Sequence, residues 1–82
     1  MIILDGGRMG DRESLHAHLK DRMNLPDYYG GNLDALNDCL GELRQRPLVV
    51  IECAGDFLEN NGGFAVGLLR VFSDNGIQVL LD

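Results

Sequence analysis

The chain has 82 residues, 45% of them hydrophobic, and thirteen acidic against seven basic side chains give a formal charge of −6. A chain of this length is expected to form one domain, 1–82, because it cannot divide its apolar residues between two cores. The acidic excess argues against nucleic acid or an anionic membrane as partner and favours a basic protein. The same charge would also serve solubility alone, so both interpretations stay open here.

The cysteines and the first residues bear on the compartment. Cys39 and Cys53 lie among apolar neighbours, which suits buried, reduced thiols better than a disulfide framework. The start of the chain lacks the basic region of a signal peptide, and no apolar run approaches bilayer length. We therefore expect a cytoplasmic protein, although a mature secreted chain would already have lost its signal.

The first third of the sequence predicts a strand and an amphipathic helix. Residues 1–4 form a short apolar run that a glycine-rich turn ends. Asp11 can cap a helix that carries Leu15, Leu19 and Met23 at four-residue spacing. This helix must end before Pro26, because the residue before a proline disfavours the helical conformation.

A turn and a second helix follow. Residues 26–31 are rich in proline, glycine and tyrosine, and Asn32 stands where an N-cap would begin a helix running to about Arg44. Adjacent tyrosines in a turn usually point in different directions. We therefore expect one ring of Tyr28 and Tyr29 to pack inside and the other to face outward.

The last part of the chain predicts two strands and a helix. Residues 48–53 form a continuous β-branched and apolar run, typical of a parallel strand covered on both faces. Residues 56–58 suggest a turn or helical turn, and Asn61 leads into a helix that ends near Asn75. A third strand follows over 77–81. This order predicts an α/β fold in which a small three-stranded parallel sheet packs with three to four helices.

The second helix is expected to have an apolar and an acidic side. At about 100° per residue, one arc collects six apolar side chains: Leu33, Ala35, Leu36, Cys39, Leu40 and Leu43. The opposite arc holds Asp34, Asp38 and Glu42 at four-residue spacing, together with Asn37 and Gly41. Each like-charged pair costs about 0.2–0.5 kcal/mol, which favours a cationic partner. A merely solvated face would show the same pattern.

Residues 25–40 read LPDYYGGNLDALNDCL, and this stretch closely resembles the signature of the barstar family of ribonuclease inhibitors. The resemblance extends more weakly over nearly the whole chain. It implies a barstar-like fold and inhibition by occlusion of a basic, secreted-type microbial ribonuclease. The second helix and the preceding loop would plug the active site, with carboxylates in the phosphate positions. It further implies a monomer when free, without cofactor.

The resemblance also suggests roles for single residues. Asp38 matches the central aspartate that meets the catalytic histidine and arginines of the nuclease, and Tyr28 matches the tyrosine that packs on that histidine. The other expected partner-binding positions are Gly30, Asn32, Asp34, Asn37, Glu42 and Asp74. Asn37 stands where the best-known members carry tryptophan, and Leu43 replaces another aromatic residue, so the target nuclease is expected to differ.

Two other functions stay open beside a ribonuclease inhibitor: an immunity protein for another toxin nuclease, and a non-inhibitory protein-binding domain. Enzyme chemistry is not expected. His16 and His18 diverge by about 200° on a helix and cannot share a metal, so both are expected at the surface. The sequence contains no CxxC, HExxH or GxSxG motif, and Cys39 lies on the apolar arc without a histidine nearby.

Overall fold

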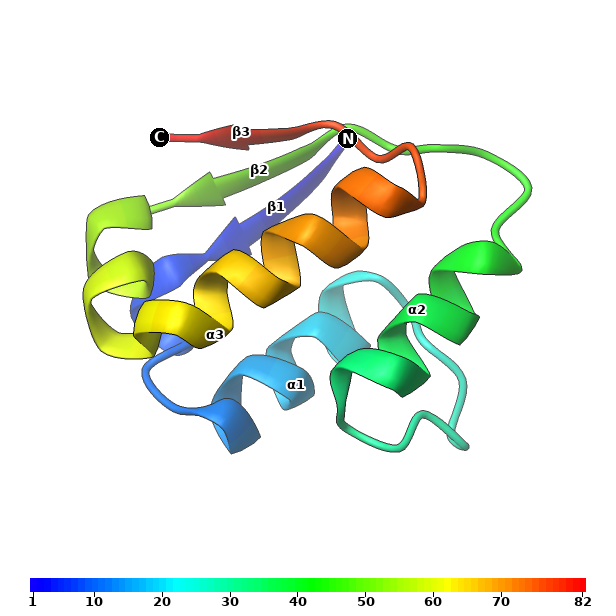
Figure 1. Ribbon diagram of the computed structural model, residues 1–82, viewed down its shortest axis with the longest axis horizontal. Coiled ribbons are helices and arrows are strands. Elements are labelled where there is room, and N and C mark those ends of the chain that lie inside the picture. The colour runs from blue at the N-terminus through cyan, green and yellow to red at the C-terminus, as the bar shows by residue number, and fades with distance from the viewer.

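A computed structural model describes residues 1–82. In chain order the elements are β1 (Ile2–Asp5), the 3₁₀ helix η1 (Gly6–Arg8), α1 (Arg12–Arg22), α2 (Leu33–Gly41), β2 (Val49–Glu52), α3 (Ala54–Asp74) and β3 (Val79–Leu81). Figure 1 shows the strands as one sheet with the three α-helices packed beneath it. The predicted α/β fold with a three-stranded parallel sheet is confirmed.

The helices cover one face of the sheet. The strands run parallel in the order β1-β2-β3, so both crossovers lie on the same face when each is right-handed. Leu4 and Ile51, which are neighbours in the register, are fully buried beneath the sheet. On the other face Val50 is half-buried and its neighbour Leu80 is 46% exposed. The expectation that the second strand is covered on both faces is therefore wrong.

A single hydrophobic cluster holds the fold together. Seventeen buried residues belong to it, and all three helices and the strands β1 and β2 contribute to them. Phe57 and Phe72 of α3 are its largest fully buried side chains. Burial of a large apolar side chain stabilises a fold by about 1.5–3 kcal/mol, so these two residues of α3 contribute strongly to the core.

The two predicted helix caps are present. The Asp11 carboxylate accepts a hydrogen bond of 2.7 Å from the Ser14 backbone N–H, which lowers the pKa of Asp11. Asn32 accepts an equivalent bond of 2.7 Å from the Ala35 N–H. The first helix ends at Arg22, before Pro26 as predicted. No helix of the chain is both long and apolar enough to cross a bilayer.

The third helix begins earlier than the position that Asn61 suggests. It starts at Ala54 and bends at Gly62, whose φ of 49° and ψ of −125° are not helical. The Asn61 side chain donates to the Phe57 carbonyl at 2.9 Å and to the Met9 carbonyl at 2.6 Å. These bonds tie the bend to the segment before α1.

The cysteines are free, and only one of them is buried. Burial raises the pKa of the Cys39 thiol, with a smaller contribution from nearby carboxylates. Cys53 is exposed, so the expectation that both thiols are buried is wrong. It lies where the chain leaves β2, and its φ of 54° turns the backbone into α3. The apolar residues that precede Cys53 in the sequence belong to β2, whereas Cys53 itself lies in the turn after the strand.

Candidate protein-binding surface

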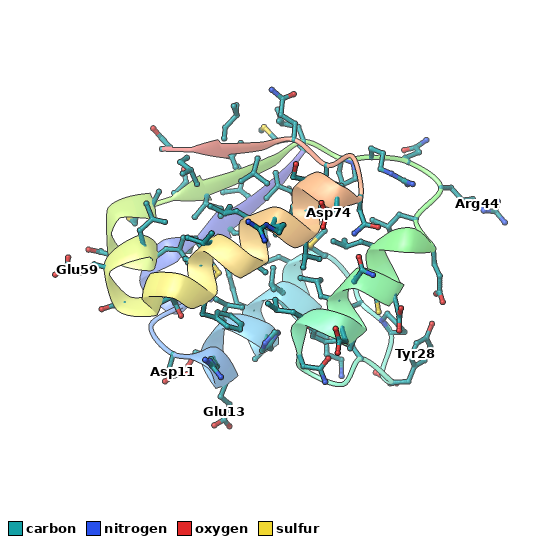
Figure 2. The ribbon with its side chains drawn as sticks, viewed as in Figure 1. Asp11, Glu13, Tyr28, Arg44, Glu59 and Asp74 are labelled. Carbon is teal, nitrogen blue, oxygen red and sulfur yellow. The ribbon has the colours of Figure 1, made fainter.

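The exposed side of α2 and its C-cap residue carry three carboxylates at four-residue spacing: Asp34, Asp38 and Glu42, here called the acidic face. All three residues are solvent-exposed, and both ion pairs of the structure join other residues. Figure 2 shows Arg44 on the loop after α2, projecting away from the body of the protein. The negative charges of the acidic face are therefore not neutralised within the chain.

The rest of α2 fixes the direction of this face. Asn32 caps the helix, and Leu40 on the opposite side is fully buried. The helix packs against α3, where a Cβ atom on Gly67 would come within 3.1 Å of the Leu33 Cδ1 atom. The glycine thus permits a close approach of the two helices, and the acidic face is held on a rigid support.

The helix ends at Gly41, three residues before the predicted end near Arg44. Arg46 precedes Pro47, a position that disfavours the helical conformation. The Arg46 Nη1 atom instead donates to the Leu43 carbonyl at 2.6 Å and closes the turn that follows the helix. The expected length of this helix is therefore corrected, but the acidic face is unchanged by the correction.

The two adjacent tyrosines point in opposite directions, as predicted. Tyr28 is 71% exposed, and its hydroxyl donates to the Glu42 carboxylate at 3.0 Å. This hydrogen bond raises the pKa of Tyr28, because the carboxylate opposes the phenolate form. Tyr29 packs against the core, and burial raises its pKa to about 12. The exposed ring therefore lies beside the acidic face, joined to its last carboxylate.

The turn between the tyrosines and α2 is exposed to solvent. Gly30 and Asn32 are both exposed. A Cβ atom on Gly30 would lie 3.6 Å from the Asn32 Nδ2 atom, an ordinary contact, so space alone does not demand glycine here. Gly31, with a φ of 70°, has the left-handed backbone that favours glycine.

An asparagine pair connects the acidic face with the end of α3. The Asn75 Nδ2 atom donates to the Asn37 Oδ1 atom at 2.8 Å, and also to the Val71 carbonyl at 2.8 Å. Asp74, the preceding residue, is exposed at the C-terminal end of α3, as Figure 2 shows. In that view α2 lies between Asp74 and Tyr28. Asp74 and Tyr28, two of the expected partner-binding residues, thus flank α2.

The loop before α2 is anchored from beneath by a histidine. His16 is only 8% exposed, and its Nδ1 atom is hydrogen-bonded to the Tyr29 hydroxyl. Burial and the Arg12 guanidinium lower the pKa of His16. His18 is half-buried and accepts the Asp5 N–H at 2.9 Å. The expectation that both histidines lie at the surface is wrong, because each meets a partner distant in the sequence.

Comparison with known proteins identifies the family of this chain. The family model described as "Barstar (barnase inhibitor)" matches residues 1–79. The chain belongs to the barstar family. A similar protein of Bacillus subtilis (strain 168), named "Putative ribonuclease inhibitor YrdF", is 42% identical over 77 residues, covering 89% of this chain and 81% of the relative. The resemblance seen in residues 25–40 is confirmed, and proteins of this family are inhibitors and not enzymes.

Two residues of this barstar-family chain that sequence reasoning did not select support the surface: His16, beneath Tyr29, and Asn75, beside Asn37. The sequence predicts Asn75 at the end of the third helix, and so indicates only a role in ending that helix. No sequence signal showed its contact with Asn37, which is 38 residues away. No three His, Cys, Asp or Glu side chains are grouped so as to hold a metal ion.

Proposed function

We propose that this barstar-family chain inhibits a basic microbial ribonuclease of the secreted type by covering its active site. The second helix and the loop before it form the contact, with Asp38 and Tyr28 at its centre and Asp34 beside them. The observation that carries the proposal is the acidic face itself: its charges are exposed, unpaired within the chain and held on a rigid helix.

The chemistry of a ribonuclease explains why such a face would bind. An active site that grips RNA presents arginine, lysine and histidine side chains to phosphate oxygens. Carboxylates at matching positions accept charge-assisted hydrogen bonds from the same donors, which are shorter and stronger than neutral ones. Because α2 is already ordered by its cap and its packing, little conformational freedom remains to be lost on binding.

Tyr28 gives the surface an aromatic anchor. Aromatic residues with a polar tip are enriched among the side chains that contribute most to protein interfaces. Its hydrogen bond to Glu42 holds the hydroxyl toward the end of α2. Aromatic stacking on a histidine of the nuclease is compatible with this arrangement. Gly30, Asn32, Asn37, Glu42 and Asp74 would form the surrounding contacts.

A titration against barnase and other basic microbial ribonucleases tests the proposal. Asp38→Ala should weaken inhibition at least a hundredfold, since one partner of a charged pair would remain buried without its counterpart. The matched control is Glu59→Ala, because Glu59 is exposed and Figure 2 places it at the far end of the protein from Tyr28. Equal inhibition by the two variants would rule out the acidic face as the contact.

The same titration separates the two alternatives. An immunity protein would inhibit one toxin nuclease and no other member of the panel. A protein-binding domain that only reuses the fold would inhibit none. Strong inhibition that disappears in Asp38→Ala but not in Glu59→Ala is the result expected of an active-site inhibitor.

The compartment and the assembly state are part of the proposal. We infer a cytoplasmic protein that is monomeric when free. The exposed, unpaired thiol of Cys53 suits a reducing compartment, where exposed thiols stay reduced. Fractionation of the source cells should recover the chain with cytoplasmic markers, and size-exclusion chromatography should give the mass of a single chain. Recovery from the growth medium, or elution as a dimer, would contradict these statements.

A further inference from the structure

The hydrogen bond between Asn75 and Asn37 fixes the direction in which Asn37 points. An asparagine amide can be turned by 180°, which exchanges its donor and its acceptor. In Asn75 this choice is settled by the Val71 carbonyl, which can only accept, so the atom 2.8 Å from it must be the donor Nδ2. That same Nδ2 lies 2.8 Å from Asn37, which must therefore turn its acceptor Oδ1 toward Asn75.

The other half of the Asn37 amide is consequently free. Its Nδ2 group is on the opposite branch of the planar amide, and it donates no hydrogen bond within the chain. Asn37 is exposed and lies one residue before Asp38 and three after Asp34. Between Asp34 and Asp38, the Asn37 amide thus displays a neutral donor beside carboxylates, which are acceptors only.

This donor cannot take part in phosphate mimicry, because the groups that grip phosphate are themselves donors. An arginine or lysine of the nuclease placed opposite Asn37 would leave two donors facing each other. A carboxylate of the nuclease would be repelled by Asp34 and Asp38. The group that fits is a neutral acceptor, and the backbone carbonyl is the most abundant neutral acceptor on a protein surface.

We propose that Asn37 determines specificity by donating a hydrogen bond to a backbone carbonyl of the ribonuclease, and that Asn75 is the positioning residue that aims this donor. The inference rests on the proposed function and adds a requirement to it. The acidic face would select basic active sites in general, whereas Asn37 would select those with a carbonyl oxygen at one place beside the phosphate site.

The decisive variant is Asn37→Asp. Aspartate has the same shape and still offers an oxygen to Asn75, but it replaces the outward donor with an acceptor. The added negative charge would by itself favour a basic nuclease, so the charge effect and the hydrogen-bond effect have opposite signs. We expect the hydrogen-bond effect to dominate and inhibition to weaken roughly 10- to 100-fold, the consequence of two acceptors facing each other in a buried contact.

The matched control is Asn60→Asp, which makes the same change of charge at an exposed position of α3 beside Glu59. It should inhibit within about twofold of the unchanged chain, since an added charge away from the contact acts only at long range. The probe is the nuclease that the unchanged chain inhibits most strongly in the panel. Inhibition by Asn37→Asp that equals or exceeds that of Asn60→Asp would overturn the role of Asn37.

The role of Asn75 is tested by a double-mutant cycle with Asn37→Ala and Asn75→Ala. If Asn75 acts by aiming Asn37, Asn75→Ala should weaken inhibition several-fold in the unchanged chain and have no effect when Asn37 is already alanine. The loss of the bond to Val71 should lower the melting temperature in both backgrounds, and by less where the bond to Asn37 is already absent. Additive effects on inhibition would show a merely structural role.

The outcomes also distinguish this inference from the proposed function. If Asp38→Ala abolishes inhibition and Asn37→Asp does not weaken it, only the inference fails. If the unchanged chain inhibits no ribonuclease of the panel, both fail together. Loss of inhibition in both variants, with the control unaffected, supports both.

Discussion

Replacing Tyr29 with phenylalanine should destabilise the fold, because the hydroxyl is the hydrogen-bond partner of a buried imidazole. Tyr29 packs against the core, and the imidazole of His16 is almost fully enclosed. Removal of one partner leaves the other without a hydrogen bond in a largely buried position, at a cost of about 1–2 kcal/mol. The ring itself is retained, so the packing of the core should change little.

The size of the chain converts this cost into a melting temperature. Unfolding entropy near the midpoint is about 2.1 cal/mol/K per residue, which gives roughly 170 cal/mol/K for this chain of 82 residues. A loss of about 1–2 kcal/mol therefore lowers the melting temperature by about 6–12 °C. Circular dichroism at pH 7 would measure it directly.

Tyr28→Phe is the matched control, because it makes the same chemical change at an exposed hydrogen bond to Glu42. Water can replace that partner, so the expected change in stability stays within about 0.5 kcal/mol. A melting temperature of Tyr29→Phe no lower than that of Tyr28→Phe would refute the reasoning, because the bond to His16 would then contribute no more than a surface contact.

Three further predictions follow from single contacts. The pKa of His16 and that of His18 are both lowered by burial, so stability should be highest above about pH 6.5 and should fall as the pH drops below that value. Urea titrations that show no decline below that pH, or the same decline after both histidines are replaced by glutamine, would contradict this reasoning. Association with a basic nuclease should slow as salt rises from about 50 to about 500 mM, because salt screens the long-range attraction that steers the two proteins together. An association rate in stopped-flow measurements that does not depend on salt would exclude electrostatic steering. Gly6→Ala should cost about 1–3 kcal/mol, because its Cβ atom would lie 2.4 Å from the Cys53 carbonyl oxygen. Gly55→Ala, at a helical position of α3 with open space around it, should leave stability unchanged or raise it by up to about 1 kcal/mol. Thermal melts that do not separate the two variants would remove the steric argument.

Local signals allowed the elements to be predicted from the sequence. Asp11 and Asn32 cap the first two long helices because their side chains bond to backbone N–H groups three residues away. Pro26 sets an outer limit to the first helix, which ends earlier, at Arg22, because Asn24 takes a left-handed φ of 54°. The apolar and acidic sides of α2 follow from helical periodicity alone. Each of these effects acts within a few residues, which is why one sequence is enough to see them.

Contacts between distant residues could not be predicted in this way. The bond between His16 and Tyr29 depends on how the loop returns over α1, and that between Asn37 and Asn75 depends on the packing of α2 on α3. The open face of the sheet depends on the order of the strands, since an apolar run does not reveal on which side a crossover passes. The sequence therefore allowed binding positions to be predicted, but not the contacts of His16 and Asn75 that hold them in place.

The acidic face also predicts a conflict between stability and inhibition that differs along α2. Asp34 lies in the first turn, where the helix dipole favours a negative charge, whereas Asp38 lies near the other end, where no basic residue offsets the dipole. Asp38 also has a carboxylate one turn away on each side, Asp34 and Glu42. Asp38→Asn should therefore raise stability by about 0.5–1 kcal/mol, and Asp34→Asn should leave it unchanged or lower it.

Both substitutions should weaken inhibition, so the pair separates the two properties. Chemical denaturation of each variant gives stability, and titration with the nuclease gives inhibition. A gain in stability together with a loss of inhibition in Asp38→Asn would mean that this carboxylate is retained for binding at the expense of the helix. If Asp38→Asn were instead less stable than the unchanged chain, the carboxylate would have a structural role, and the argument that its charge serves a cationic partner would lose its physical basis.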